Sequence, residues 1–99
     1  MTYRISKSAQ HDLEEIWLYT LENWSIKQAD HYLDLIIDEV EFLAKNPLSG
    51  KDYNQVREDY YRSKVKSHFI FYRINHDEKL IEVIRILHQE MDIDNRLQD

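Results

Sequence analysis

The second half of the chain carries the side chains that could do chemistry. Between Tyr60 and Asp92, basic and aromatic residues are concentrated in two apolar runs, and the segment ends in His-Gln-Glu-Met-Asp. Cleavage of RNA without a metal needs a general base for the ribose 2′-hydroxyl, an acid for the leaving oxygen, and cations for the charge of the phosphorane. The side chains of the right types for such a centre are His68, Arg73, Arg85 and His88, with Arg62 and Tyr72 beside them.

Each of these side chains also has a structural role open to it. Arg73 and Arg85 could pair with Glu82 or Asp92, and His88 could cap one end of a sheet. A charged residue inside the apolar run LIEVIRIL must either reach the surface or be paired, because an unpaired buried charge is costly. This placement favours Arg85 and His88 as functional candidates, but the residues alone leave both roles open.

Other kinds of site are disfavoured. Gly50 is the only glycine, so a glycine-rich phosphate loop cannot form. The five histidines lie in different predicted elements, none at the spacing of a zinc helix, and no cysteine can supply a thiolate or a disulfide. We therefore expect no metal and no cofactor. The chain shows neither an apolar signal region nor a run of about 18 apolar residues, so a cytoplasmic protein with no membrane partner is the expectation.

The charge is unevenly divided along the chain. The net charge is −6, but residues 1–46 carry −5, residues 47–88 carry +2 and residues 89–99 carry −3. The middle segment contains a basic patch, defined here as Arg62, Lys64, Lys66 and Arg73, to which a protonated His68 could add. Such a patch is either a solvated strand face that discourages edge pairing or a surface for phosphates or an acidic peptide.

The elements that must position these residues follow from periodicity. A short strand is expected at Thr2–Ile5, and apolar residues at three- and four-residue steps predict a helix over about 8–23. Ser25 and Gln28 form a capping box for a second helix, with Trp24 as its hydrophobic staple, and Asn46 before Pro47 ends it. The turn between the helices is short, so they form an antiparallel hairpin.

After a predicted loop at residues 47–56, the apolar period changes from 3.6 to 2. Strands are predicted at Tyr60–Lys66, Ser67–Ile74 and Leu80–His88, and residues 89–99 form either a terminal helical turn or a tail. The expected fold is α+β, one domain over residues 1–99: an N-terminal strand and a helical hairpin packed on a mostly antiparallel four-stranded sheet.

Aromatic residues divide into two groups. Trp17, Trp24 and Tyr32 lie on the apolar faces of the hairpin and are expected in the core. A second set is harder to bury together, and an exposed surface of this kind suits a partner helix or peptide. This second set consists of Tyr19, Tyr53, Tyr60 and Tyr61.

Several short motifs, in order, resemble the RelE/ParE family of toxins from toxin–antitoxin systems. They are A-x-x-D-L-x-x-I from Ala9, W-S-x-x-Q-A from Trp24, N-P-x-x-G from Asn46, H-x-I-F-Y-R from His68 and R-I-L-H-Q-x-M-D from Arg85. The resemblance covers nearly the whole chain, and the closing His88, Gln89, Met91 and Asp92 are similar to the ParE branch. It implies a compact sheet with an N-terminal helical hairpin and an antitoxin whose C-terminal segment wraps around the toxin.

The two branches of this family differ in action: RelE-like members cleave mRNA on the ribosome, whereas ParE-like members poison DNA gyrase. RelE-like toxins are strongly basic and carry a catalytic Tyr or His-Tyr pair beyond the last strand, but this chain has a pI near 5.3 and continues from His88 with Gln89 and Glu90. The resemblance therefore favours a gyrase inhibitor without chemistry of its own. A ribosome-dependent endonuclease is the alternative, and a protein that binds antitoxin but has lost toxicity is a third.

The residues expected to contact gyrase are Arg62, Lys64, Lys66, Arg73, Arg85, His88 and Met91. Those expected to contact the antitoxin are Tyr19, Tyr53, Tyr60 and Tyr61.

Overall fold

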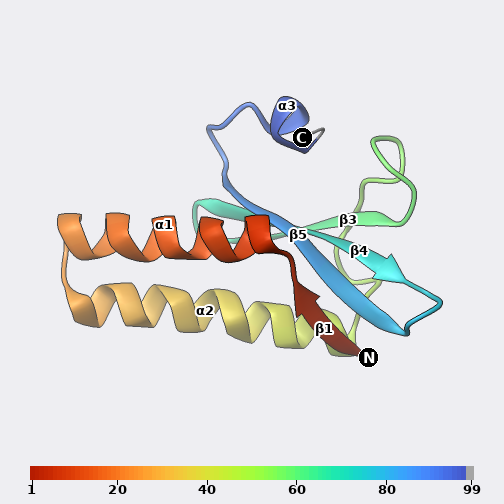
Figure 1. The fold of residues 1–99 in the computed structure, drawn as a ribbon, viewed down its shortest axis with the longest axis horizontal. Coiled ribbons are helices and arrows are strands. Elements are labelled where there is room, and N and C mark those ends of the chain that lie inside the picture. The colour runs from red at the N-terminus through yellow and green to blue at the C-terminus, as the bar shows by residue number, and fades with distance from the viewer. Residues whose placement is uncertain (98–99) are drawn as a thin grey trace.

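A five-stranded sheet with a helical hairpin on one face forms the fold (Figure 1). This computed structural model describes residues 1–97. The elements in chain order are β1 (Thr2–Ile5), α1 (Lys7–Asn23), α2 (Ile26–Lys45), β2 (Lys51–Asp52), β3 (Tyr60–Val65), β4 (His68–Asn75), β5 (Leu80–His88) and α3 (Ile93–Leu97). The strands lie side by side in the order β1-β5-β4-β3-β2, with β1 parallel to β5 and the other neighbours antiparallel.

Two serines start the long helices. The Ser6 hydroxyl accepts the backbone N–H of Ala9 at 3.0 Å, and the Ser25 hydroxyl accepts that of Gln28 at 3.1 Å. Each bond satisfies a backbone donor that the first helical turn would otherwise leave without a partner. The Ser25 half of the predicted capping box is confirmed, as is the end of α2 before Pro47. The predicted staple is wrong, because the Trp24 side chain is 67% exposed.

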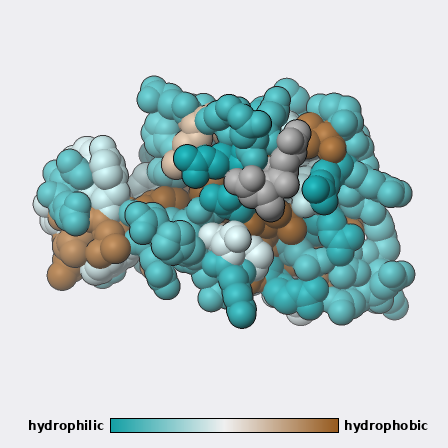
Figure 2. All heavy atoms as spheres, turned by 45° about the horizontal axis from the view of Figure 1, so that its top comes forward, coloured by the Kyte–Doolittle hydropathy of each residue, from teal (hydrophilic) through white to brown (hydrophobic). Residues whose placement is uncertain are grey.

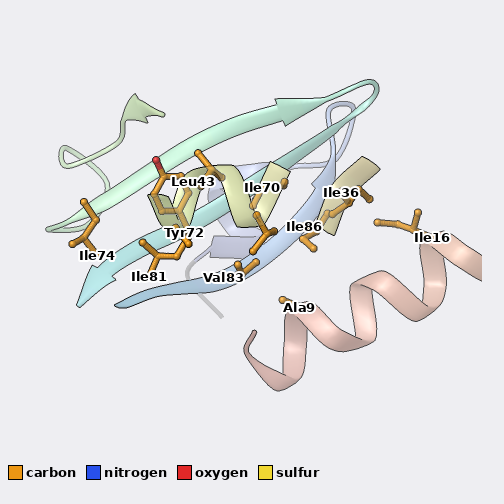
Figure 3. Packing of buried hydrophobic residues seen from close by; sticks show 12 residues of the cluster. Ala9, Ile16, Ile36, Leu43, Ile70, Tyr72, Ile74, Ile81, Val83 and Ile86 are labelled. Carbon is orange, nitrogen blue, oxygen red and sulfur yellow. The ribbon is translucent and has the colours of Figure 1, made fainter. Parts of the chain in front are cut away.

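The main core lies between the hairpin and the sheet (Figure 3). Alternate residues of β4 and β5 point toward the helices, as the period of a strand requires. They meet the apolar stripe of α2, and Ala9 lets α1 approach closely. The buried side chains of this core include Ile36, Val40, Leu43, Ile70, Tyr72, Ile74, Ile81, Val83 and Ile86.

A β-bulge interrupts the pairing of β4 with β5. Phe71 lies opposite Arg85, but the next residue, Tyr72, lies opposite Val83, so Ile84 is an extra residue. A bulge of this kind shifts the alternation of side chains by one position. Val83 and Ile86 consequently face the hairpin, whereas Leu87 packs in a second cluster on the opposite face.

This second cluster lies under the C-terminal end of the chain. It consists of Phe71, Leu87 and Leu97, packed against Tyr53, Val56, Phe69 and Ile93. Helix α3 supplies two of these residues, so of the two alternatives for residues 89–99, a helical turn and a tail, the helical turn is the one found in the described part. The remainder of that prediction, residues 98–99, lies outside the described residues.

The sheet has five strands rather than the predicted four. The additional strand, β2, lies inside the predicted loop at residues 47–56 and pairs Lys51 with Arg62 and Asp52 with Tyr61. Two residues are too few to show a period, so sequence alternation could not reveal them. The α+β class and the helical hairpin are as predicted. None of the described helices is long and apolar enough to cross a membrane.

Candidate functional site

A notch of about 340 Å³ separates the free end of the hairpin from the nearest corner of the sheet. In Figure 2, the free end of the hairpin forms a lobe set off from the rest of the molecule, with apolar atoms on its surface. We call this hollow the aromatic notch. It is lined by Tyr19 and Thr20 of α1, Trp24 in the turn between the helices, Gln28 and Tyr32 of α2, Ser67 and His68 at the β3–β4 turn, and His88 at the end of β5.

His68 lies at the centre of a small polar cluster in this notch. Its Nδ1 atom is 2.7 Å from the hydroxyl of Tyr32, which also lies 3.2 Å from the carbonyl of Val65. Burial, reinforced by repulsion from His88, lowers the pKa of His68 from 6.5 to about 4. The suggestion that His68 adds charge to the basic patch is therefore wrong at neutral pH, where the ring is uncharged.

His88 lies directly beside His68 on the neighbouring strand. The two are register partners, and their rings meet edge to face with centroids 5.2 Å apart. The backbone N–H of Glu90 donates to Nδ1 of His88 at 3.1 Å. In the neutral ring the hydrogen therefore sits on Nε2, which can donate but not accept.

A second hollow, of about 290 Å³, lies on the other side of His68 and contains a buried ion pair. Arg85 donates from Nε to Oδ2 of Asp12 at 2.8 Å and from Nη2 to Oδ1 at 3.0 Å. The same Oδ2 accepts the backbone N–H of Ile86 at 2.9 Å. Because β1 pairs with β5 only as far as Val83, Asp12 satisfies a donor on the free edge of β5. Met91 and Arg96 line the same hollow.

The basic patch is on the opposite face of the sheet, and part of it is committed to internal contacts. The Arg62 guanidinium lies 4.2 Å from the ring centroid of Phe69, and Lys64 lies 5.7 Å from it. Arg73 donates to Glu82 at 2.6 Å. Hydrogen bonds from Arg4 and Arg73 lower the pKa of Glu82 to about 2, which keeps this carboxylate charged.

The predicted gyrase-contact residues thus fall in two places rather than one. Arg62, Lys64 and Arg73 lie on the face away from the hairpin, with Lys66 exposed in the adjoining turn. Arg85, His88 and Met91 line the two hollows beside the hairpin. The pairing of Arg73 with Glu82 is confirmed, and Arg85 pairs with Asp12.

The four residues suggested for RNA cleavage are not assembled into one centre. His68, His88 and Arg85 lie near one another, but Arg73 is five residues further along β4 and on the other face. At about 3.3 Å per residue, that separation is roughly 16 Å along the strand.

The expectation of four exposed tyrosines is wrong in part. Tyr19 is 61% exposed, but Tyr60 is buried at 7%. Tyr53 packs edge to face on Phe71, and both Tyr53 and Tyr61 are half-buried.

The three hairpin aromatics also differ from the core prediction. Tyr32 does pack on the core, Trp17 is half-buried and donates to Asp30 at 3.0 Å, and Trp24 is exposed. A Trp next to a helix cap was a poor indicator of burial, because the hairpin extends beyond the sheet that would cover it (Figure 1).

Asp12, which lies within the motif that begins at Ala9, was not predicted as a site residue. A signal was present: Asp12 lies three residues after Ala9 and four before Ile16, on the buried stripe of α1. A buried carboxylate there needs a partner, and Arg85, inside the apolar run LIEVIRIL, was a candidate cation. No three His, Asp or Glu side chains within residues 1–97 are grouped as a metal site would require.

Comparison with known proteins identifies the family. Residues 3–93 match the family described as the ParE toxin of type II toxin–antitoxin systems, parDE. The chain belongs to the ParE toxin family. The resemblance to the ParE branch is thereby confirmed.

Relatives of this ParE-family chain match over nearly their full length. Toxin ParE1 of Mycobacterium tuberculosis is 39% identical over 95 residues, which is 96% of each chain. Toxin ParE1 of Caulobacter vibrioides is 36% identical over 89 residues, 90% of each chain. A solved structure titled as the chromosomal ParDE system of P. aeruginosa superposes with a TM-score of 0.77 at 18% identity, covering 91% of this chain and 97% of that one. At this identity, the superposition shows a shared fold.

Proposed function

We propose that this ParE-family toxin inhibits DNA gyrase by binding it and stabilising the complex with cleaved DNA, and that a cognate antitoxin neutralises it. Family membership supports the toxin role, and the parDE system named in the family description supports a ParD-like partner. The positions of the charged side chains bear on whether the toxin acts by binding alone or by cleaving RNA.

The observation that favours binding over RNA cleavage is that the two candidate arginines are held in ion pairs and the buried histidine is uncharged. A nuclease centre needs cations aimed at the phosphorane and a histidine that exchanges protons near neutral pH. Here Arg85 is held by Asp12, and Arg73 is held by Glu82 on the far face. His68, with its pKa of about 4, takes up no proton at neutral pH.

Of the residues expected to contact gyrase or the antitoxin, we retain those whose side chains can reach a partner. Lys64 and Lys66 are exposed, and with Arg62 they form the cationic surface that we assign to gyrase or to the DNA it holds. His88 and Met91 remain candidate contacts on the hairpin side. Tyr19 is the exposed member of the aromatic set that we assign to the antitoxin.

One pair of assays tests the proposal. Purified chain is added to gyrase with plasmid DNA, and separately to ribosomes translating a defined mRNA. We expect loss of supercoiling and accumulation of linear plasmid, with intact mRNA. Unchanged supercoiling together with cut mRNA would establish the endonuclease alternative. Inertness in both assays would favour an antitoxin-binding protein that has lost toxicity.

A further inference from the structure

The aromatic notch combines features that suit a positively charged, planar side chain. Its walls are aromatic: Tyr19 and Trp24 meet edge to face with ring centroids 6.2 Å apart, and Tyr32 and His68 meet at 5.4 Å. Ring faces of Trp and Tyr attract cations, and a guanidinium also stacks on them. Trp24 and Tyr19 are 67% and 61% exposed, so their rings are accessible to a partner.

The notch also offers hydrogen-bond acceptors. The side chains of Gln28 and Ser67 line it and make no hydrogen bond with residues 1–97, so their oxygens can accept. No lysine or arginine lines it, and His68 is neutral at neutral pH. A guanidinium has five N–H donors and no acceptor, so it can use these oxygens.

The charge of the surroundings points the same way. The first 46 residues, which include the whole hairpin, carry a net charge of −5. A protein that covers this hairpin is favoured if it brings positive charge. The notch volume of about 340 Å³ is sufficient for one large side chain.

We propose that the aromatic notch is the receptor for an arginine side chain of the cognate antitoxin, held between Tyr19 and Trp24 on one side and the histidine pair on the other. This inference rests on the proposed antitoxin pairing. It adds the place of one contact, its chemistry and the residue type that the antitoxin must supply.

The first test uses a small probe and no antitoxin. Isotope-labelled chain is titrated with arginine blocked as its N-acetyl amide, and NMR follows the indole N–H of Trp24 and the rings of His68 and His88. We expect these signals to move together with a Kd of about 1–10 mM, as suits a single cation–aromatic contact. Blocked citrulline, which has the same shape without the charge, should bind at least about fivefold more weakly.

Matched variants locate the response. Trp24→Ala and Tyr19→Ala each remove one exposed wall and should abolish most of the shift. Phe42→Ala, which removes a half-exposed aromatic ring of α2 outside the notch lining, should leave it unchanged. Equal binding of citrulline, or equal loss in Phe42→Ala, would overturn the inference.

The second test uses the proposed cognate antitoxin. Each of its arginines is changed to glutamine, and affinity is measured against wild-type chain and Trp24→Ala. We expect one arginine whose effect disappears in the Trp24→Ala background, because the two side chains form one contact. If the loss of binding free energy from every arginine substitution simply adds to the loss from Trp24→Ala, the inference is overturned. If the wild-type pair does not associate, the proposed pairing fails, while the titration still decides whether the notch accepts a guanidinium.

Discussion

Arg85 and Asp12, at opposite ends of the sequence, form a two-bonded ion pair that fastens helix α1 to the free edge of strand β5. The carboxylate also accepts the backbone N–H of Ile86, so its oxygens serve three donors. Both side chains are largely buried, with exposed fractions of 17% and 9%. The pair therefore positions the helix that carries Tyr19 relative to the strand that carries His88.

Removing one partner of this pair should be costly. Asp12→Ala removes the carboxylate that accepts from the buried Arg85 guanidinium and from the backbone N–H of Ile86, so we expect a loss of about 3–5 kcal/mol in the free energy of unfolding. Urea denaturation measures it. The double variant Asp12→Leu with Arg85→Met removes both charges and should recover most of the loss. A cost below about 1 kcal/mol for Asp12→Ala would contradict a structural role for the pair.

The stability of the chain should fall in mild acid because of His68. Its folded pKa of about 4 lies below its ordinary value of 6.5, so the unfolded chain takes up the proton first. The contribution is complete above pH 6.5, is lost as pH falls toward 4, and then levels off. The ring faces Tyr32 and His88, with the carboxylate of Asp12 acting weakly in the opposite direction.

We expect this effect to amount to about 1–2 kcal/mol, after allowance for the part of the ring that water still screens. Thermal or urea unfolding at pH 7.5, 6, 5 and 4.5 measures it, with His68→Gln as the control that removes the titrating ring. If wild type and His68→Gln lose stability in parallel, the pKa assigned to His68 is wrong.

Gly50 should not tolerate a larger side chain. A Cβ atom there would lie 2.9 Å from the carbonyl of Arg62 and against the hydroxyl of Tyr72. That hydroxyl accepts the N–H of Gly50 at 3.1 Å and donates to the carbonyl of Pro47 at 2.7 Å. We expect Gly50→Ala to cost about 1–3 kcal/mol, measured by urea denaturation.

Leu48→Ala is the control for this loop, because Leu48 is 72% exposed and should contribute little. Tyr72→Phe removes the hydroxyl that blocks the new methyl group, at a cost of its own hydrogen bonds. The double variant should therefore be less destabilised than the two single costs combined. Full additivity would show that the hydroxyl does not limit the space at residue 50.

Reversing charge on the outer face should weaken action on gyrase. Lys64→Glu with Lys66→Glu changes two exposed residues and should leave stability nearly unchanged. We expect the concentration for half-inhibition of supercoiling to rise by about tenfold or more, with the largest difference at low salt. Lys27→Glu, an exposed lysine of α2, is the matched control. Equal inhibition by both variants would remove this face from the proposed surface.

Much of the fold could be predicted from the sequence because the relevant signals are local. Ser25 and Gln28 defined a helix start within four residues, and Asn46 before Pro47 defined its end. The three long strands had clear apolar runs. The short strand β2 had none, because its two residues are held by pairing with Arg62 and Tyr61 rather than by a pattern of their own.

The candidate site was less predictable, since it depends on which side chains face each other. The motif residues His68 and His88 did prove to be neighbours across the sheet. Tyr60 was expected at the surface and is buried, whereas Trp24 was expected in the core and is exposed. Exposure of a bulky ring is decided by what covers it, and the hairpin end has no covering layer among residues 1–97.

The sequence by itself determined the family, the helical hairpin and the residue types at the sheet corner, because caps, periods and ordered motifs are written in neighbouring positions. Only the tertiary structure decided which face of the sheet each of these side chains lies on. The extra residue at Ile84 shifts the alternation of β5, which places Ile86 and His88 toward the hairpin and Leu87 on the other side, and leaves Arg85 within reach of Asp12. A one-residue shift of this kind arises from the pairing of two distant strands, so strict alternation along β5 could not have shown it.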